Sequence, residues 1–95
     1  MPEYKYHIHY KKLFRKQYQQ LKKRGYDMSL INDVVDRLAK GETLSPKHRD
    51  HPLLGKRKGY RDCHIKDDWI LIYRVDKDVL ILILSETGTH ADTLE

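Results

Sequence analysis

The run Val79-Leu80-Ile81-Leu82-Ile83-Leu84 is the feature that most restricts how this chain folds. It is apolar at every position, which leaves no polar face for a surface helix or for a strand that is exposed on one side. At six residues it is also far too short to span a bilayer. A short segment of this kind is typical of a strand that is covered on both faces. We therefore expect residues 79–85 to form a central strand of a sheet.

Two further strands are expected just before this run, at residues 60–65 and 69–75. The first is separated from the second by Lys66-Asp67-Asp68, and the second from the apolar run by Asp76-Lys77-Asp78. Connections this short force neighbouring strands to run antiparallel. The chain therefore predicts three consecutive antiparallel strands after residue 59.

The first half of the chain predicts one strand and two helices. Residues 4–10 alternate strictly between apolar or aromatic and polar side chains, which is typical of a half-buried strand. Residues 11–24 and 28–40 carry apolar side chains at helical spacing, with Gly25 and Gly41 as stops and Asp27 as an N-cap. Helices joined by so few residues pair as an antiparallel hairpin.

Residues 42–59 contain Pro46, Pro52, Gly55 and Gly59 and no clean period, so they predict a loop with room for one short strand. The order is then β-α-α-β-β-β. We expect an α+β fold in which a helical hairpin packs on a small, mainly antiparallel sheet. At 95 residues the chain has room for a single domain, residues 1–95.

Charge is distributed unevenly along the chain. Residues 1–61 carry 16 Lys and Arg against 6 Asp and Glu, a net charge of +10, whereas residues 62–95 carry 3 against 8, a net charge of −5. A basic segment of this size favours contact with a polyanion such as a nucleic acid. The alternative is that the lysines only keep a helix face soluble.

The chain shows no feature of export. Residues 1–10 lack the apolar core of a signal peptide, and no segment could cross a membrane. The single cysteine, Cys63, has no partner for an internal disulfide and is expected to be a buried small apolar residue. We expect a cytoplasmic protein.

Four side chains at predicted strand ends or in loops could carry chemistry: His51, His64, Asp68 and His90. Cleavage of RNA without a metal needs a base for the 2′-OH, an acid for the departing 5′-oxygen and cations for the phosphate. Histidine suits both proton-transfer roles because its pKa lies near neutrality. The nearest candidates for holding phosphate are Lys56, Arg57, Lys58 and Arg61.

Each of these residues also has an ordinary structural explanation. A single histidine in a loop is usually a surface residue, and Asp68 fits a turn. Trp69 could stack on a base, but at the start of a strand it is more often a core anchor. The pairs His7/His9 and His48/His51 lack a cysteine or carboxylate at a structural-zinc spacing, so they do not indicate a metal site.

The order of motifs is itself informative. The chain contains, in sequence, Arg49-Asp50-His51-Pro52-Leu53-Leu54-Gly55, Lys58-Gly59-Tyr60-Arg61-Asp62-Cys63-His64-Ile65, Asp67-Asp68-Trp69-Ile70-Leu71-Ile72-Tyr73-Arg74 and Thr87-Gly88-Thr89-His90. Together with the basic helical hairpin, this set resembles the YafQ branch of the RelE-like toxins over essentially the whole chain.

The resemblance implies a ribosome-dependent endoribonuclease that cuts messenger RNA in the A site without metal or cofactor. His51, His64, Asp68 and His90 match the active-site set of that branch. His90 is the favoured general acid; Asp68, His51 and His64 remain alternatives for the base, and Trp69 matches a position associated with the site. The implied partners are the ribosome, the messenger, a cognate antitoxin and, only as the toxin–antitoxin complex, operator DNA. The expected ribosomal RNA contacts are Lys12, Arg15, Lys16, Lys22 and Lys23.

Two positions depart from the pattern of that branch. Glu86 stands where many such toxins carry an arginine, and Leu94 replaces a terminal phenylalanine. An acid near the scissile phosphate would oppose the developing negative charge. These departures leave open a catalytically weakened module that chiefly binds its antitoxin and operator DNA. Inhibition of another target such as gyrase is a third alternative, but such an inhibitor needs no acid–base pair.

Overall fold

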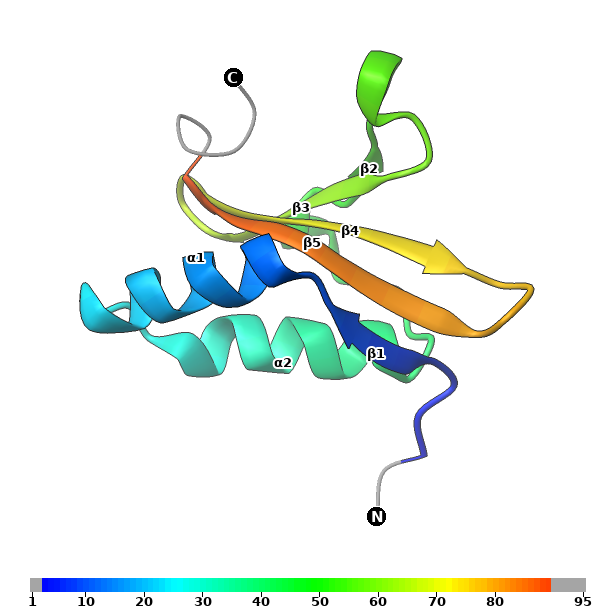
Figure 1. Cartoon of the computed structure of the whole chain (residues 1–95), viewed down its shortest axis with the longest axis horizontal. Coiled ribbons are helices and arrows are strands. Elements are labelled where there is room, and N and C mark those ends of the chain that lie inside the picture. The colour runs from blue at the N-terminus through cyan, green and yellow to red at the C-terminus, as the bar shows by residue number, and fades with distance from the viewer. Residues whose placement is uncertain (1–2, 90–95) are drawn as a thin grey trace.

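The computed structural model describes residues 3–89, in which two helices cover one face of a five-stranded sheet (Figure 1). Short 3₁₀ turns, η1 and η2, lie on either side of the second strand. The elements in chain order are β1 (His7–Tyr10), α1 (Lys12–Lys23), α2 (Met28–Ala39), η1 (Pro46–His48), β2 (His51–Pro52), η2 (Gly55–Arg57), β3 (Arg61–Lys66), β4 (Trp69–Asp76) and β5 (Ile81–Thr89). The predicted α+β class and element order are confirmed.

The strand order in the sheet is β1-β5-β4-β3-β2. β5 therefore has a neighbour on both sides, as the apolar run predicted. The pairs β2–β3, β3–β4 and β4–β5 are antiparallel, and β1 lies parallel to β5. β2 is the short strand for which the loop left room.

The start of β5 differs from the prediction. The strand begins at Ile81, and Val79 and Leu80 lie in the preceding turn with 61% and 46% of their surface exposed. The side chain of Asp76 accepts hydrogen bonds from the backbone N–H of Asp78 and Val79, and Leu80 has a positive φ of 56°. These contacts lengthen the turn, so Val79 and Leu80 are not part of the strand. Within the strand Leu82 and Leu84 are buried but Ile81 and Ile83 are only partly buried, so the expectation that the whole run is covered on both faces was wrong.

β1 is also shorter than its alternating pattern suggests. The backbone N–H groups of Lys5 and Tyr6 both donate to the carbonyl of Ala39, at the end of α2, instead of joining the sheet.

The helix ends follow the predicted signals. Asp27 caps α2 by accepting from the N–H of Ser29, and Gly25 takes a positive φ of 86° after α1.

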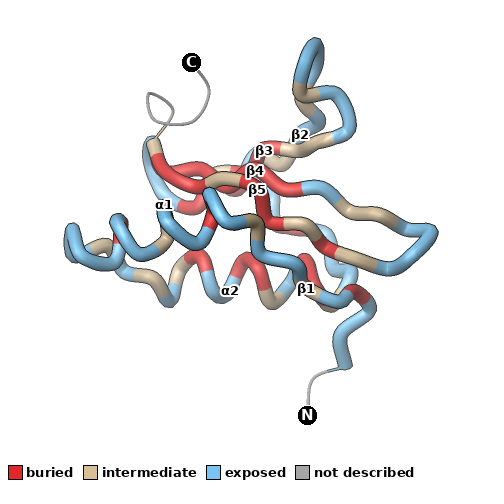
Figure 2. Tube along the Cα trace, in the orientation of Figure 1, coloured by how far each residue is buried: buried red, intermediate tan, exposed pale blue. Residues whose placement is uncertain are grey.

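Alternation along the strands places one set of side chains against the helices. Figure 2 shows where the buried residues lie along the strands and along α2. Leu82 and Leu84 of β5 and Leu71 of β4 have no exposed surface and pack with Phe14 and Val34 of the two helices. Cys63 belongs to the same core, as predicted, and burial raises the pKa of its thiol.

No helix in residues 3–89 is long and apolar enough to cross a membrane.

Replacing Leu84 by alanine should lower the free energy of unfolding by about 2–5 kcal/mol, because it leaves a cavity in the layer between sheet and helices. Urea unfolding followed by circular dichroism would measure the loss. Leu54→Ala, at a position that is 85% exposed, is the matched control and should leave the midpoint unchanged. Equal effects of the two variants would contradict this assignment of the core.

Candidate functional site

The second face of the sheet, which the helices do not cover, gathers the polar side chains. Residues directly opposed on neighbouring strands point to the same face. The pairs His51–Asp62, Asp62–Ile72 and Ile72–Glu86 therefore form one row across four strands, and His64–Ile70–Gly88 forms the next row. We call this surface the helix-free face. η2 lies on the side of the sheet away from α1 and α2 (Figure 1).

His51 is held in one orientation by the backbone. Its Nδ1 lies 2.7 Å from the carbonyl oxygen of Arg49, which takes a left-handed conformation with φ of 47°. A carbonyl only accepts, so Nδ1 carries the proton and Nε2 of the neutral ring is left as a proton acceptor. Nε2 lies 3.7 Å from Oδ2 of Asp62, and the side chain of His51 is half exposed. This is the geometry of a general base beside a carboxylate.

Asp62 is a functional candidate that the sequence reasoning missed. It is 1% exposed, and its Oδ1 has no hydrogen-bond partner among the described residues. Burying a carboxylate oxygen without a hydrogen-bond partner destabilises the folded protein. We therefore treat Asp62 as a candidate for a role at the site. The available signal was its spacing: Asp62 precedes His64 by two residues in an alternating strand, so the two share a face.

His64 lies on the helix-free face beside that row, about 7 Å along β3 from Asp62. Its Nδ1 is 3.4 Å from the carbonyl of Asp67, and its own carbonyl contacts Nδ1 of the buried His48 at 2.7 Å. His51 and His64 thus lie in neighbouring rows of the same face. The hollow of about 450 Å³ that His64 lines does not include His51.

The other two members of the predicted set are placed differently. Asp68 lies exposed in the turn between β3 and β4, where it lines a hollow of about 550 Å³ with Tyr26 and Trp69. That hollow does not include His51 or His64. His90 follows the end of β5 and lies outside the described residues, as does Leu94.

The predicted phosphate-binding cations fall into two groups. Lys56 and Lys58 are exposed at η2, and between them Arg57 forms an ion pair with Glu86 on β5. Arg61 faces the opposite way: its register partner is Tyr73, a core residue. Its Nε donates to Asp50 at 3.1 Å, so the expectation that it holds phosphate beside the histidines does not fit.

A further cation reaches the helix-free face from the start of α1. Nζ of Lys11 donates to the hydroxyl of Tyr60 at 2.8 Å and lies 5.1 Å from the ring centroid. This bond, with a smaller contribution from Arg74, lowers the pKa of the Tyr60 phenol. Sequence spacing gave no signal for it because Lys11 and Tyr60 are 49 residues apart.

Trp69 is a core residue. It is 4% exposed, its Nε1 donates to Oγ1 of Thr87 at 2.9 Å, and its ring meets that of Tyr26 edge to face at 5.2 Å. Thr87 donates in turn to the carbonyl of Ile70 at 2.8 Å. Although Trp69 borders the hollow beside Asp68, only 4% of its surface is exposed, which leaves little area on which a base could stack. The structure therefore supports the core-anchor interpretation.

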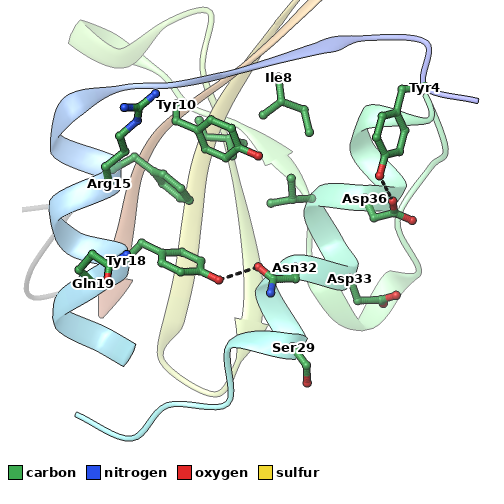
Figure 3. Close-up of a pocket in the computed structure, with 13 residues that line it drawn as sticks. Tyr4, Ile8, Tyr10, Arg15, Tyr18, Gln19, Ser29, Asn32, Asp33 and Asp36 are labelled. Atoms are coloured by element: carbon green, nitrogen blue, oxygen red, sulfur yellow. Dashed lines mark hydrogen bonds between the residues drawn. The ribbon is translucent and has the colours of Figure 1, made fainter. Parts of the chain in front are cut away.

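The largest hollow, about 810 Å³, lies on the helix side of the sheet among β1, α1 and α2 (Figure 3). Aromatic side chains line it, and two of their hydroxyls are tied to α2: Tyr18 donates to Asn32 at 2.9 Å and Tyr4 to Asp36 at 2.5 Å. Among the described residues, no histidine lines it. Because the acid–base groups are elsewhere, we do not assign the chemistry to this hollow.

Within residues 3–89, no three His, Cys, Asp or Glu side chains are grouped so that they could hold a metal ion. What the helix-free face offers is an imidazole with a fixed tautomer, a buried carboxylate, a second imidazole and an arginine brought in by an ion pair.

Comparison with known proteins supports the resemblance. The family model described as "Bacterial toxin of type II toxin-antitoxin system, YafQ" matches residues 6–95. The mRNA interferase toxin YafQ of Escherichia coli strain K12 is 43% identical over 82 residues, which cover 84% of this chain and 78% of that protein.

Two solved structures agree closely with the fold. The crystal structure of YafQ from E. coli strain BL21(DE3) has a TM-score of 0.89 at 34% identity and covers 95% of this chain and 99% of its own. The E. coli DinJ–YafQ toxin–antitoxin complex contains a chain that matches with a TM-score of 0.87 at 35% identity. The match covers 96% of this chain and 99% of that one.

Trp69 is the only tryptophan in the chain, so intrinsic fluorescence tests its burial directly. Acrylamide should quench it several-fold less than free tryptophan, because the ring is packed against Tyr26 and bonded to Thr87. Saturating single-stranded RNA should leave its emission nearly unchanged. Strong quenching by either reagent would restore the base-stacking interpretation.

Proposed function

This chain belongs to the YafQ family of bacterial type II toxins, and we propose that it cuts messenger RNA with acid–base groups on the helix-free face. Its relatives are named mRNA interferase toxins, and the chain is accordingly an endoribonuclease of that type. The observation that carries the assignment of the site is the arrangement of His51, fixed by the Arg49 carbonyl, beside the buried carboxylate of Asp62.

We assign the general base to His51. Its Nε2 takes the proton of the 2′-OH, and the oxygen then attacks the adjacent phosphorus. The ring becomes an imidazolium, and the Asp62 carboxylate, whose Oδ2 lies 3.7 Å from Nε2, stabilises this positive charge. Asp62 acts as a positioning residue because it acts on the substrate only through His51.

The reaction also needs a general acid and groups that bind the phosphate. The 5′-oxygen leaves as the 2′-oxygen attacks, and it needs a proton from an acid on the other side of the phosphate. We assign this role to His90, as the family likeness implied. His64, two residues along β3 from Asp62, contributes to binding the charged linkage, and Asp68 is a candidate for orienting a neighbouring imidazole.

The ribosome is proposed as the setting of the reaction, with α1 as the surface that contacts its RNA. The proposed contacts are the cations of α1, which lie on its solvent side: Lys12, Arg15, Lys16, Lys22 and Lys23. Orientation of the scissile linkage by the ribosome would supply a positional contribution to the rate in addition to that of the acid–base groups. The proposed location is the cytoplasm, where ribosomes and messenger occur.

A cognate antitoxin is the protein partner of the chain, as in the E. coli DinJ–YafQ complex. Repression of operator DNA by the pair belongs to the same proposal. The second candidate function is a weakened module that mainly binds this antitoxin, and Glu86 is the observation that favours it. Full antitoxin binding without growth arrest would identify that case.

Alanine at His51 should lower the single-turnover rate of cleavage on programmed ribosomes by about 10²-fold or more, because it removes the proton acceptor. His64→Ala should also lower the rate. His7→Ala, an exposed histidine on β1, is the matched control and should cleave normally. Unchanged cleavage by His51→Ala would remove the proposed base, and intact messenger with the unmutated protein would remove the nuclease.

Charge reversal on α1 should weaken ribosome binding and reduce its dependence on salt. For each phosphate that Lys16 or Lys23 no longer neutralises, the slope of log K against log salt should fall by about 0.7–0.9. Lys77→Glu, in the exposed turn between β4 and β5, is the control. Unchanged slopes for Lys16→Glu and Lys23→Glu would mean that α1 presents only a solvated surface.

A further inference from the structure

The ion pair between Arg57 and Glu86 joins two parts of the chain that are distant in sequence. Arg57 ends η2, and Glu86 lies in the middle of β5, 29 residues later. Their side chains are 36% and 14% exposed, so the pair is partly shielded from water and less weakened by it than a surface pair. The contact fixes the guanidinium above the sheet.

The position of Glu86 determines over which part of the sheet the Arg57 side chain is held. Glu86, Ile72, Asp62 and His51 form one row, with His51 at one end and Glu86 at the other. Three strand spacings separate the ends, about 14 Å between backbones. The middle of the row is closed to solvent, because Ile72 and Asp62 are 0% and 1% exposed. A dinucleotide that spans the row would therefore contact the exposed side chains at its two ends, His51 and the Arg57 that Glu86 holds.

We infer that Arg57, held by Glu86, is the cation that binds the scissile phosphate opposite His51. The inference rests on the proposed RNA cleavage and specifies which residue supplies the positive charge. A guanidinium carries five N–H donors in a planar fork, so it can donate hydrogen bonds to a carboxylate and a phosphate at the same time. Glu86, although acidic, is then a positioning residue and not an obstacle to the anion.

The other cations near this face are less well placed. Lys56 and Lys58 are exposed at η2, and no ion pair ties them to the sheet within the described part of the chain. Arg61 points to the helix side and donates to Asp50. Lys11 donates to Tyr60, outside the row that contains His51.

The test compares variants of Arg57 and Glu86 on ribosomes programmed with a messenger that the unmutated protein cuts. Arg57→Gln should lower the single-turnover cleavage rate by about tenfold or more, the size expected for losing a charged hydrogen bond. Glu86→Gln should cost clearly less, because the guanidinium remains. Lys77→Gln, in the exposed turn between β4 and β5, is the matched control, with cleavage within about twofold of the unmutated protein.

The exchanged pair Arg57→Glu with Glu86→Arg should recover most of the rate lost by Arg57→Glu alone, because the guanidinium then reaches the same place from β5. Thermal melting of each variant shows whether it is folded. Equal losses for Arg57→Gln and Glu86→Gln would overturn the inference and make the pair a simple tether for η2.

A second readout does not depend on cleavage. A messenger with a 2′-O-methyl group at the scissile nucleotide cannot be cut there, because its nucleophile is blocked. The ribosome carrying it should bind Arg57→Gln several-fold more weakly than Glu86→Gln, and equal affinities would contradict the inference. If the unmutated protein binds this complex and never cleaves the natural messenger, the proposed function fails while the assignment of Arg57 still stands.

Discussion

The two-residue alternation of β3 and β4 is the constraint on which the rest of this structure depends. One set of their side chains, including Cys63 and Leu71, completes the core with the helices, and the other set, including Asp62 and His64, forms the helix-free face. A slip of one residue in register would exchange the two sets and lose both core and site. Stability and chemistry are therefore encoded in the same strands, so strand pairing positions the polar groups without a separate scaffold.

Asp62 shows how the site departs from what stability alone would favour. An unpartnered oxygen on a nearly fully buried carboxylate destabilises the folded state, by about 1–3 kcal/mol for an unsatisfied polar group. In the proposed mechanism His51 gains a proton, and the positive charge that this places 3.7 Å from Oδ2, the other oxygen of the carboxylate, would lower this cost. The face is thus better suited to the charged intermediate of the proposed reaction than to its resting state, as expected of a site complementary to a transition state.

Much of the fold could be predicted from the sequence, because helix caps, apolar periods and short turns are local signals. One error arose from a contact between distant residues, and the other from a turn whose side-chain hydrogen bonds the residue pattern did not reveal. The carbonyl of Ala39 shortens β1, and the Asp76 turn delays β5 by two residues. The site was predicted less completely. Residue type drew attention to His51 and His64, but it gave no signal for the contacts of Asp62 or of the pair Arg57–Glu86. It also did not reveal that Arg61 points to the helix side of the sheet. A side chain's direction depends on strand register, which residue type does not reveal.

The position of Cys63 has a consequence for how the protein responds to oxidants. It is the chain's single cysteine, it has no exposed surface, and burial raises the pKa of its thiol. Oxidation requires an accessible thiolate, and here the thiol stays both protonated and enclosed. Peroxide or disulfide stress therefore has no cysteine on the folded protein through which to switch its activity.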